Sequence, residues 1–215
     1  MNCLIVSGGK IDFDFAVNFI KEEKFDLIIA ADSGMHFLYK AEIIPDIIVG
    51  DFDSVSGDVL EYYRSTHEIK IHQLNPVKDD TDTEYAIRQA VNMGADSISI
   101  IGGTGDRLDH VMGNISLLGI GIEENMEIFL VDSHNRIRLI DKPLVLSRRK
   151  QFGEYVSLIP YTSVVKNITL KGFKYPLEDY DMGGFNSLGI SNEIKDENAY
   201  IDFSNGLLLV IESKD

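Results

Sequence analysis

The chain contains few of the residues that define several common classes of protein. Its 215 residues include one cysteine and no tryptophan. A single cysteine excludes an internal disulfide and a cluster of thiolate ligands for a metal. Because Cys3 lies in the first apolar run of the chain, we expect its thiol to be buried and unreactive.

Basic residues are scarce as well. The chain has 20 lysines and arginines against 35 aspartates and glutamates, a formal net charge of −15. Nucleic acids and anionic membranes bind to basic patches, so this charge disfavours both as partners. No apolar run approaches the ~20 residues of a membrane-spanning helix, and the N-terminus lacks the pattern of a secretory signal. We therefore expect a cytoplasmic protein that handles cations or metal-complexed anions.

Several catalytic signatures are also missing. The sequence has no G-x-x-x-x-G-K-[ST] motif, no complete G-x-G-x-x-G, no H-E-x-x-H and no nucleophile elbow. His36, His67, His72 and His134 show no metal-ligand spacing. These absences disfavour zinc chemistry and hydrolysis by an activated serine.

The first part of the chain alternates between apolar runs and amphipathic segments. Strands are predicted over residues 3–6, 27–31, 47–49, 69–71, 97–101 and 128–131, and helices over residues 12–23, 56–64, 81–93 and 107–118. Continuous runs of Ile, Leu and Val indicate strands that are covered on both faces, as in a parallel sheet. The sequence therefore predicts an α/β domain over residues 1–134, with a mainly parallel, Rossmann-like sheet and flanking helices.

The pattern changes after residue 134. Apolar and polar residues alternate over residues 136–140, 155–159, 164–170, 200–203 and 207–211, with Gly, Pro and Asn between the segments. This pattern predicts an antiparallel β-sandwich over residues 135–215. A domain of roughly 80 residues is small for independent stability. We expect it to pack on the first domain or on a second subunit.

Two acidic motifs lie near the ends of predicted strands. Asp51 and Asp53 follow one strand, and an extended backbone would point both carboxylates to the same side. Asp79 and Asp82 flank the start of a helix for which Thr81 is the predicted N-cap. Turns and helix N-termini also favour aspartate without any metal. Because ligands of parallel sheets bind beyond the carboxyl ends of the strands, the two motifs favour a divalent cation there.

A glycine-rich turn at residues 102–105 joins a predicted strand to a helix. Backbone N–H groups in such a turn can hold phosphate, although the glycines can also simply permit a tight turn. Arg107 offers a planar guanidinium to phosphate oxygens. Asp109 and His110 can join a metal site or orient a hydroxyl, while His110 alone is more typical of a helix surface. Together with the carboxylates, these groups indicate phosphoryl-type transfer.

With these motifs in view, the chain resembles the bacterial type of the thiamine pyrophosphokinase (thiamine diphosphokinase) family. The resemblance runs over nearly the full length, through residues 31–34, 45–46, 50–54, 78–84, 102–110 with Asn114, and 187–193. It implies an α/β domain, a C-terminal β-sandwich and a homodimer in which both subunits contribute to each active site. It also implies transfer of the diphosphoryl group from Mg-ATP to thiamine, giving thiamine diphosphate and AMP.

The site residues that follow from the motifs and the resemblance fall into four sets. The catalytic set is Asp51, Asp53, Asp79, Asp82 and Arg107, and the Mg²⁺ ligands are Asp51, Asp53 and Asp82. The nucleotide-binding set is Asp32, Ser33, Gly102, Gly103, Thr104, Gly105, Arg107, Asp109 and His110. The substrate-binding set is Lys78, Thr81, Asp82, Ser187, Ser191 and Asn192.

Two departures from the family pattern leave alternatives open. Asp106 stands where bacterial relatives often have glycine, and a carboxylate there would repel a nucleotide unless it points away or joins the metal site. Some relatives stack a tryptophan on thiamine. Here an aromatic such as Phe185 or Tyr180, or no aromatic at all, would have to serve. The alternatives are a Mg²⁺-dependent phosphohydrolase or nucleotidyltransferase, and a non-catalytic module that binds nucleotide or thiamine.

Overall fold

The computed structural model describes residues 1–215 except residues 54, 67–68, 76–79 and 185. The chain forms two compact units, Met1–Ser133 and His134–Asp215. None of the helices in the described part of the chain is both long enough and apolar enough to cross a membrane.

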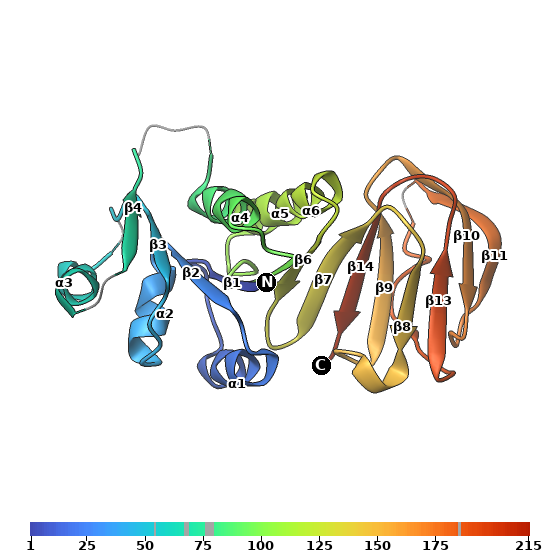
Figure 1. The fold of residues 1–215 in the computed structure, drawn as a ribbon. Coiled ribbons are helices and arrows are strands. Elements are labelled where there is room, and N and C mark those ends of the chain that lie inside the picture. Colours follow the sequence, from blue (N-terminus) through green and yellow to red (C-terminus); the bar gives the residue numbers. More distant parts are fainter. Residues whose placement is uncertain (54, 67–68, 76–79, 185) are drawn as a thin grey trace. The chain divides into compact units, whose positions relative to one another are not determined.

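The N-terminal unit alternates strands and helices. Its elements are β1 (Asn2–Val6), α1 (Phe13–Glu23), β2 (Leu27–Ala31), α2 (Gly34–Lys40), β3 (Ile47–Gly50), α3 (Gly57–Thr66), β4 (Lys70–Gln73), α4 (Asp82–Asn92), β5 (Ser97–Ile101), α5 (Leu108–Leu117), α6 (Gly119–Glu123) and β6 (Glu127–Val131). In Figure 1, α1 and α2 lie on one face of the sheet, and α4, α5 and α6 lie on the other.

The strands of this unit are parallel and run in the order β6-β5-β1-β2-β3-β4. Their apolar runs are buried as the sequence predicts, and Leu4, Ile29, Ile48 and Ile98 are fully inaccessible to solvent. The order of the strands reverses at β1, because the chain moves outward through β2, β3 and β4 and then returns to place β5 on the other side. In sheets of this kind, ligands bind at the carboxyl ends of the strands beside such a reversal.

The helix caps explain where two helices of this unit begin. The Asp12 carboxylate accepts a hydrogen bond from the Phe15 N–H at 2.9 Å and starts α1. The Thr81 hydroxyl accepts one from the Glu84 N–H at 3.2 Å, which confirms the predicted N-cap of α4. Helix α2 was not predicted, because seven residues are too few for a clear helical period.

The C-terminal unit consists of strands. They are β7 (Asn135–Ile140), β8 (Leu144–Ser147), β9 (Tyr155–Pro160), β10 (Val164–Lys171), β11 (Leu177–Gly183), β12 (Asn192–Glu193), β13 (Asn198–Asp202) and β14 (Leu208–Ser213), with a short 3₁₀ helix, η1 (Arg148–Lys150). Within the unit, one sheet has the order β12-β9-β14-β7 and the other β11-β10-β13-β8, and the paired strands are antiparallel. The predicted α/β plus β-sandwich fold class is confirmed.

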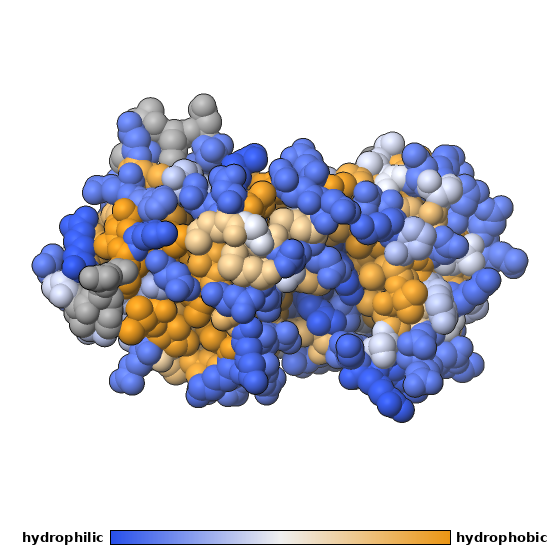
Figure 2. Space-filling view, in the orientation of Figure 1, coloured by the Kyte–Doolittle hydropathy of each residue, from blue (hydrophilic) through white to orange (hydrophobic). Residues whose placement is uncertain are grey.

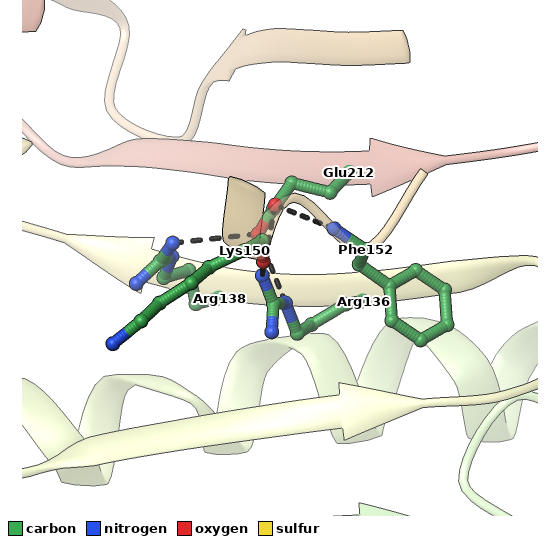
Figure 3. Close-up of polar contacts among 5 residues, drawn as sticks. All are labelled: Arg136, Arg138, Lys150, Phe152 and Glu212. Carbon is green, nitrogen blue, oxygen red and sulfur yellow. Dashed lines mark hydrogen bonds and ion pairs between the residues drawn. The ribbon is translucent and has the colours of Figure 1, made fainter. Parts of the chain in front are cut away.

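A buried ion cluster joins β7 to β14 beside the apolar core of this unit. The Glu212 carboxylate, whose side chain is 1% exposed, accepts hydrogen bonds from Arg136 at 2.8 and 2.9 Å and from Arg138 at 3.4 Å. The Phe152 N–H adds a further hydrogen bond at 3.1 Å, and Arg136 also donates to the Lys150 carbonyl (Figure 3). Because a buried carboxylate is costly unless it is paired, these donors are what make Glu212 tolerable there.

Candidate active site

Asp51 and Asp53 lie in a short loop at the carboxyl end of β3. The Asp51 carboxylate accepts a hydrogen bond from the Asp53 N–H at 3.0 Å. Between them, Phe52 is only 9% exposed and has a φ angle of 65°, which is unusual for a residue with a side chain. The buried ring anchors the loop, and Asp53 is exposed to solvent. The positive φ at Phe52 shows that the segment is not extended, so the predicted reason for both carboxylates to point to the same side was wrong.

The start of α4 is connected to the end of β1. The Thr83 and Ser7 hydroxyls lie 2.9 Å apart, and Ser7 is buried. Asp82 and Glu84 are in the first turn of α4, where the helix dipole favours negative charge. Lys78 and Asp79 of the predicted second acidic motif lie outside the described residues.

Three hydrogen bonds hold the glycine-rich turn after β5. The Gly9 N–H donates to the Gly102 carbonyl at 3.0 Å, and the Asn114 amide donates to the Gly103 carbonyl at 2.8 Å. The Thr104 hydroxyl donates to the Asp132 carboxylate at 2.6 Å. Gly102 has a φ angle of 73°, and a Cβ there would lie 2.3 Å from the Ser7 carbonyl oxygen. The turn is therefore tied to the loop after β1, to α5 and to the residue after β6.

Arg107 and Asp109 form an exposed ion pair at the start of α5. The Arg107 Nη2 lies 2.6 Å from one oxygen of Asp109, and Nε lies 3.2 Å from the other. The hydrogen bond from Arg107 lowers the pKa of Asp109, and the same bond raises the pKa of Arg107. Both side chains are about two-thirds exposed (70% and 66%). Because exposed ion pairs contribute little free energy, Arg107 can exchange this partner for a phosphate at small cost. His110 and Asp106 are also exposed.

Asp32 and Ser33 lie at the carboxyl end of β2. The Asp32 N–H donates to the Val49 carbonyl at 2.7 Å, and the Ser33 hydroxyl donates to the Gly8 carbonyl at 3.4 Å. A Cβ on Gly34 would lie 2.0 Å from the Val6 carbonyl oxygen, so only glycine lets α2 begin this close to β1. These contacts join Asp32 to β3 and Ser33 to the loop after β1.

A cavity of about 390 Å³ lies between the loop after β1, the start of α1 and helix α2. Its walls include the backbone of Gly8 and Gly9 and the side chains of Phe13, Phe37 and Lys40. Hydrophobic residues gather over α2 and toward α1 in the space-filling view (Figure 2). Of this region, the sequence predicted only the residues at the carboxyl end of β2 as part of a binding site.

In the C-terminal unit, Asn192 holds the backbone of a neighbouring segment. Its carboxamide oxygen accepts hydrogen bonds from the Tyr175 and Glu193 N–H groups, both at 3.0 Å, and its nitrogen donates to the Tyr175 carbonyl at 2.8 Å. The Ser191 N–H donates to the Ser157 hydroxyl at 3.0 Å, and the Ser187 carbonyl accepts from the Ile190 N–H at 3.2 Å. The buried amide of Asn192 therefore positions Tyr175.

Comparisons with known protein families give a match in each of the two units. The family model "Thiamin pyrophosphokinase, catalytic domain" matches residues 10–130, and "Thiamin pyrophosphokinase, vitamin B1 binding domain" matches residues 144–208. The chain belongs to the thiamine pyrophosphokinase family.

Individual relatives of the thiamine pyrophosphokinase family match over most of their length. The chain is 34% identical over 193 residues to the thiamine pyrophosphokinase of Bacillus subtilis strain 168, covering 90% of each chain. A solved structure of the Bacillus subtilis protein has a TM-score of 0.90 at 32% identity and covers 100% of both chains. One from Geobacillus thermodenitrificans has a TM-score of 0.86 at 31% identity, covering 100% of this chain and 98% of that one. The predicted family and enzyme class are confirmed.

The residues present fit a magnesium ion that arrives with a nucleotide. In the part of the chain that the structure describes, no three Asp, Glu, His or Cys side chains come together as a metal site. Mg²⁺ is commonly held by one or two carboxylates together with water and substrate phosphates. Asp51 and Asp53 supply two such carboxylates from one loop. The grouping of Asp82 with them stays a prediction.

The sequence motifs did not identify Asp132 as a residue of the site. Asp132 directly follows β6, so it lies at the same edge of the sheet as the glycine-rich turn. A signal was present, because a carboxylate after a buried parallel strand is expected at the ligand-binding edge. Its contact with Thr104 spans 28 residues and could not be read from local spacing.

Proposed function

We propose that the chain transfers the diphosphoryl group of ATP to the hydroxyethyl oxygen of thiamine, forming thiamine diphosphate and AMP. One observation carries this proposal within the thiamine pyrophosphokinase family. The loop of Asp51 and the glycine-rich turn of residues 102–105 both lie at the carboxyl edge of the parallel sheet, on either side of β1. Candidate oxygen ligands for a cation and candidate backbone donors for phosphate thus lie at one edge of the sheet.

The glycine-rich turn is the proposed phosphate site. Its Gly102 and Gly103 carbonyls and the Thr104 hydroxyl are bonded to Gly9, Asn114 and Asp132. These bonds keep the turn in one conformation before the nucleotide binds, which reduces the entropy lost on binding. Arg107 begins the following helix and is the proposed second contact for phosphate oxygens.

The proposed magnesium ligands are Asp51, Asp53 and Asp82. A bound Mg²⁺ would neutralise charge on the phosphate oxygens of ATP. Asp51 and Asp53 would hold it at the carboxyl end of β3, in the loop that Phe52 anchors. Asp51 and Asp53 place two negative charges in one loop, and a cation bound there would offset them.

In the proposed reaction, the hydroxyl oxygen of thiamine attacks the β-phosphorus of ATP. A bond forms between that oxygen and the β-phosphorus, and the bond from the β-phosphorus to the bridging α–β oxygen breaks. AMP leaves with the bridging oxygen, and the hydroxyl proton is lost. Asp79, which lies outside the described residues, is the proposed proton acceptor. Little base strength is needed if the transition state is loose.

The N-terminal unit is the proposed ATP- and Mg²⁺-binding domain, and the C-terminal unit the proposed thiamine-binding and dimerisation domain. In the latter, Ser187, Ser191 and Asn192 are the proposed thiamine residues, together with Lys78 and Thr81 of the N-terminal unit. Because the Asn192 amide is bonded to Tyr175, we infer that it acts by positioning that segment.

A homodimer is part of the proposal, and α5 supports it. Leu108 and Met112 lie one turn apart on this helix and are 77% and 62% exposed. Apolar side chains in one row of an exposed helix are typical of a surface that another protein covers. The row begins beside Arg107 and Asp109, so a second copy bound there would border the proposed active site.

The test is incubation with ATP, Mg²⁺ and thiamine, followed by chromatography of the nucleotides and thiamine esters. We expect equal amounts of AMP and thiamine diphosphate. Release of ADP, or turnover of ATP that does not depend on thiamine, would indicate a phosphohydrolase and contradict the proposal. Tight binding of both substrates without turnover would indicate a binding module instead.

A further inference from the structure

We propose that Ser157 is a positioning residue for thiamine, because its buried hydroxyl holds the backbone of Ser191 in the conformation that binds the substrate. The inference rests on the proposed function, in which residues 187–192 contact thiamine. No motif singled out Ser157, which lies inside a strand predicted from its apolar residues over residues 155–159.

The hydroxyl of Ser157 is buried within β9. The residue lies between Val156 and Leu158, which belong to the core, and it is 7% exposed. A hydroxyl in such a place is costly unless it is hydrogen-bonded. Its oxygen accepts a hydrogen bond from the Ser191 N–H at 3.0 Å. The hydroxyl is therefore directed at the backbone of the proposed thiamine segment.

The backbone of Ser191 is in an unfavourable conformation. Its φ angle is 56°, in the left-handed region that residues with a side chain rarely adopt. Strand β12 begins only at the next residue, Asn192, and on the other side the Leu158 N–H donates to the Gly189 carbonyl at 2.8 Å. The Ser191 N–H lies between these two contacts with β9, and the Ser157 hydroxyl supplies its acceptor.

The buried polar side chains of the C-terminal unit fall into two pairs. Among the described residues of this unit, they are Arg138, Ser157, Asn192 and Glu212. Arg138 and Glu212 contact each other. Ser157 binds the backbone of Ser191, and Asn192 is the residue beside it. The side chain of Ser191 is exposed and accessible to a ligand. Strained backbone that buried neighbours hold in place is concentrated at functional sites.

The test is the kinetics of Ser157→Ala, which removes the acceptor. We expect the KM for thiamine to rise about fivefold, the effect of one hydrogen bond between neutral groups. The kcat and the KM for ATP should change less than about twofold, because binding of thiamine is weakened equally before and during the reaction. If Ser157→Ala does not fold, Ser157→Cys serves instead, since it keeps the volume and offers only a weak acceptor.

Thr162→Val is the matched control. The Thr162 hydroxyl also accepts a hydrogen bond from a backbone N–H of the C-terminal unit, that of Leu207 at 3.1 Å, and Thr162 belongs to none of the proposed site sets. A purely structural role of the hydroxyl predicts the same behaviour for both variants. We expect both to lower the Tm and only Ser157→Ala to raise the KM for thiamine.

Calorimetric titration with thiamine, in the presence of Mg²⁺ and a non-hydrolysable ATP analogue, separates this inference from the proposed reaction. We expect Ser157→Ala to weaken thiamine binding about fivefold here too. A wild type that binds thiamine without forming thiamine diphosphate would contradict the proposed reaction and leave Ser157 to be judged by the Kd.

Three results would overturn the role of Ser157. They are an unchanged KM and Kd for thiamine in Ser157→Ala, an equal rise in its KM for ATP, and the same rise in the KM for thiamine in Thr162→Val. A wild type that does not bind thiamine would overturn this role together with the proposed function.

Discussion

At the scale of single residues, the loop after β3 carries two acidic side chains on either side of a buried aromatic ring. Asp51 and Asp53 bring two carboxylates into one loop. Phe52 lies between them with a buried ring and a φ angle that is unfavourable for a residue with a side chain. Backbone strain of this kind persists where the surrounding structure fixes it, and it is concentrated at functional sites. A strained loop that carries two carboxylates is consistent with the proposed role of Asp51 and Asp53 as ligands of a cation.

The first residue-scale prediction concerns Asp53→Asn. We expect this substitution to lower the rate of thiamine diphosphate formation by about 100-fold or more, because it removes charge from the proposed metal site. Its midpoint in urea should stay the same or rise, since one of the two negative charges in the loop disappears. Asp58→Asn, which removes an exposed charge five residues away, is the matched control and should leave activity unchanged. An unfolded Asp53→Asn variant would instead assign the residue a structural role.

The second residue-scale prediction concerns the bond between Thr104 and Asp132. Thr104→Val should raise the KM for ATP about tenfold, because a hydrogen bond to a charged group contributes about 1.5–3 kcal/mol. Thr104→Ser keeps the hydroxyl, so its KM for ATP should stay close to that of the wild type. Steady-state kinetics with each substrate varied in turn provide the measurement. An equal rise in the KM for thiamine would show that the bond supports the fold in general rather than the phosphate turn.

At the scale of helices and strands, the two units use their surfaces differently. Helix α5 has no buried residue and exposes Leu108 and Met112. Strands β7 and β14 instead enclose the charges of Arg136, Arg138 and Glu212 (Figure 3). Apolar side chains are usually buried and charged ones exposed, so both features are unusual. Substitutions in either are expected to have a measurable effect.

The prediction for α5 is that Met112→Glu disrupts the homodimer. A carboxylate in a covered apolar surface would have to be desolvated, so dimerisation should weaken by at least about tenfold. Light scattering after size-exclusion chromatography measures the mass as a function of concentration. Met93→Glu is the control, because Met93 is 43% exposed at the end of a different helix. A wild-type chain that stays monomeric at all concentrations would refute the dimer itself.

The prediction for the strands is that Glu212→Ala destabilises the C-terminal unit by about 3–5 kcal/mol, because it removes the carboxylate shared by the buried Arg138 and the partly buried Arg136. Urea denaturation followed by far-ultraviolet circular dichroism is the measurement. Glu197→Ala removes an exposed carboxylate 3.8 Å from Arg149 and should cost under about 1 kcal/mol. Similar losses of unfolding free energy in the two variants would show that burial does not determine how much an ion pair contributes to stability.

At the scale of the whole molecule, charge and family agree on the type of ligand. The net charge of −15 disfavours a bare polyanion as partner. ATP is an anion too, but as a magnesium complex it carries less negative charge. The part of the chain that the structure describes forms no three-ligand metal site on its own. The metal and the nucleotide should therefore bind better together than either does alone.

The whole-molecule prediction is a difference in thermal stability. Mg-ATP at a hundredfold excess over its Kd should stabilise the native chain by about 2.7 kcal/mol, which follows from mass action. Mg²⁺ alone, or ATP with EDTA, should raise the Tm by much less. Scanning fluorimetry with Asp53→Asn beside the wild type is the measurement. A full Tm shift with ATP and EDTA would exclude the metal from nucleotide binding.

Some of the site was readable from sequence and some was not. Asp51, Asp53 and the glycine-rich turn follow strands with clear apolar runs, so their place at one edge of the sheet followed from local pattern. The cavity was missed because Phe13 and Phe37 approach across 24 residues and α2 has no clear period. Asn192 was predicted as a thiamine contact, and that stays a prediction, but its bonds to Tyr175 depend on a pairing between distant segments.

By itself, the sequence determines the order and type of most elements, the change from an α/β unit to a β unit, the family, and which polar residues follow which strands. Apolar periodicity and short motifs involve residues that are close in the sequence, so they can be recognised without a structure. Only the tertiary structure decides which side chains meet. It joins Thr104 to Asp132, ties Gly9 to Gly102, and forms an open pocket between α1 and α2. Those contacts depend on strand order and helix packing, which are set by burial of the whole sheet rather than by any single segment.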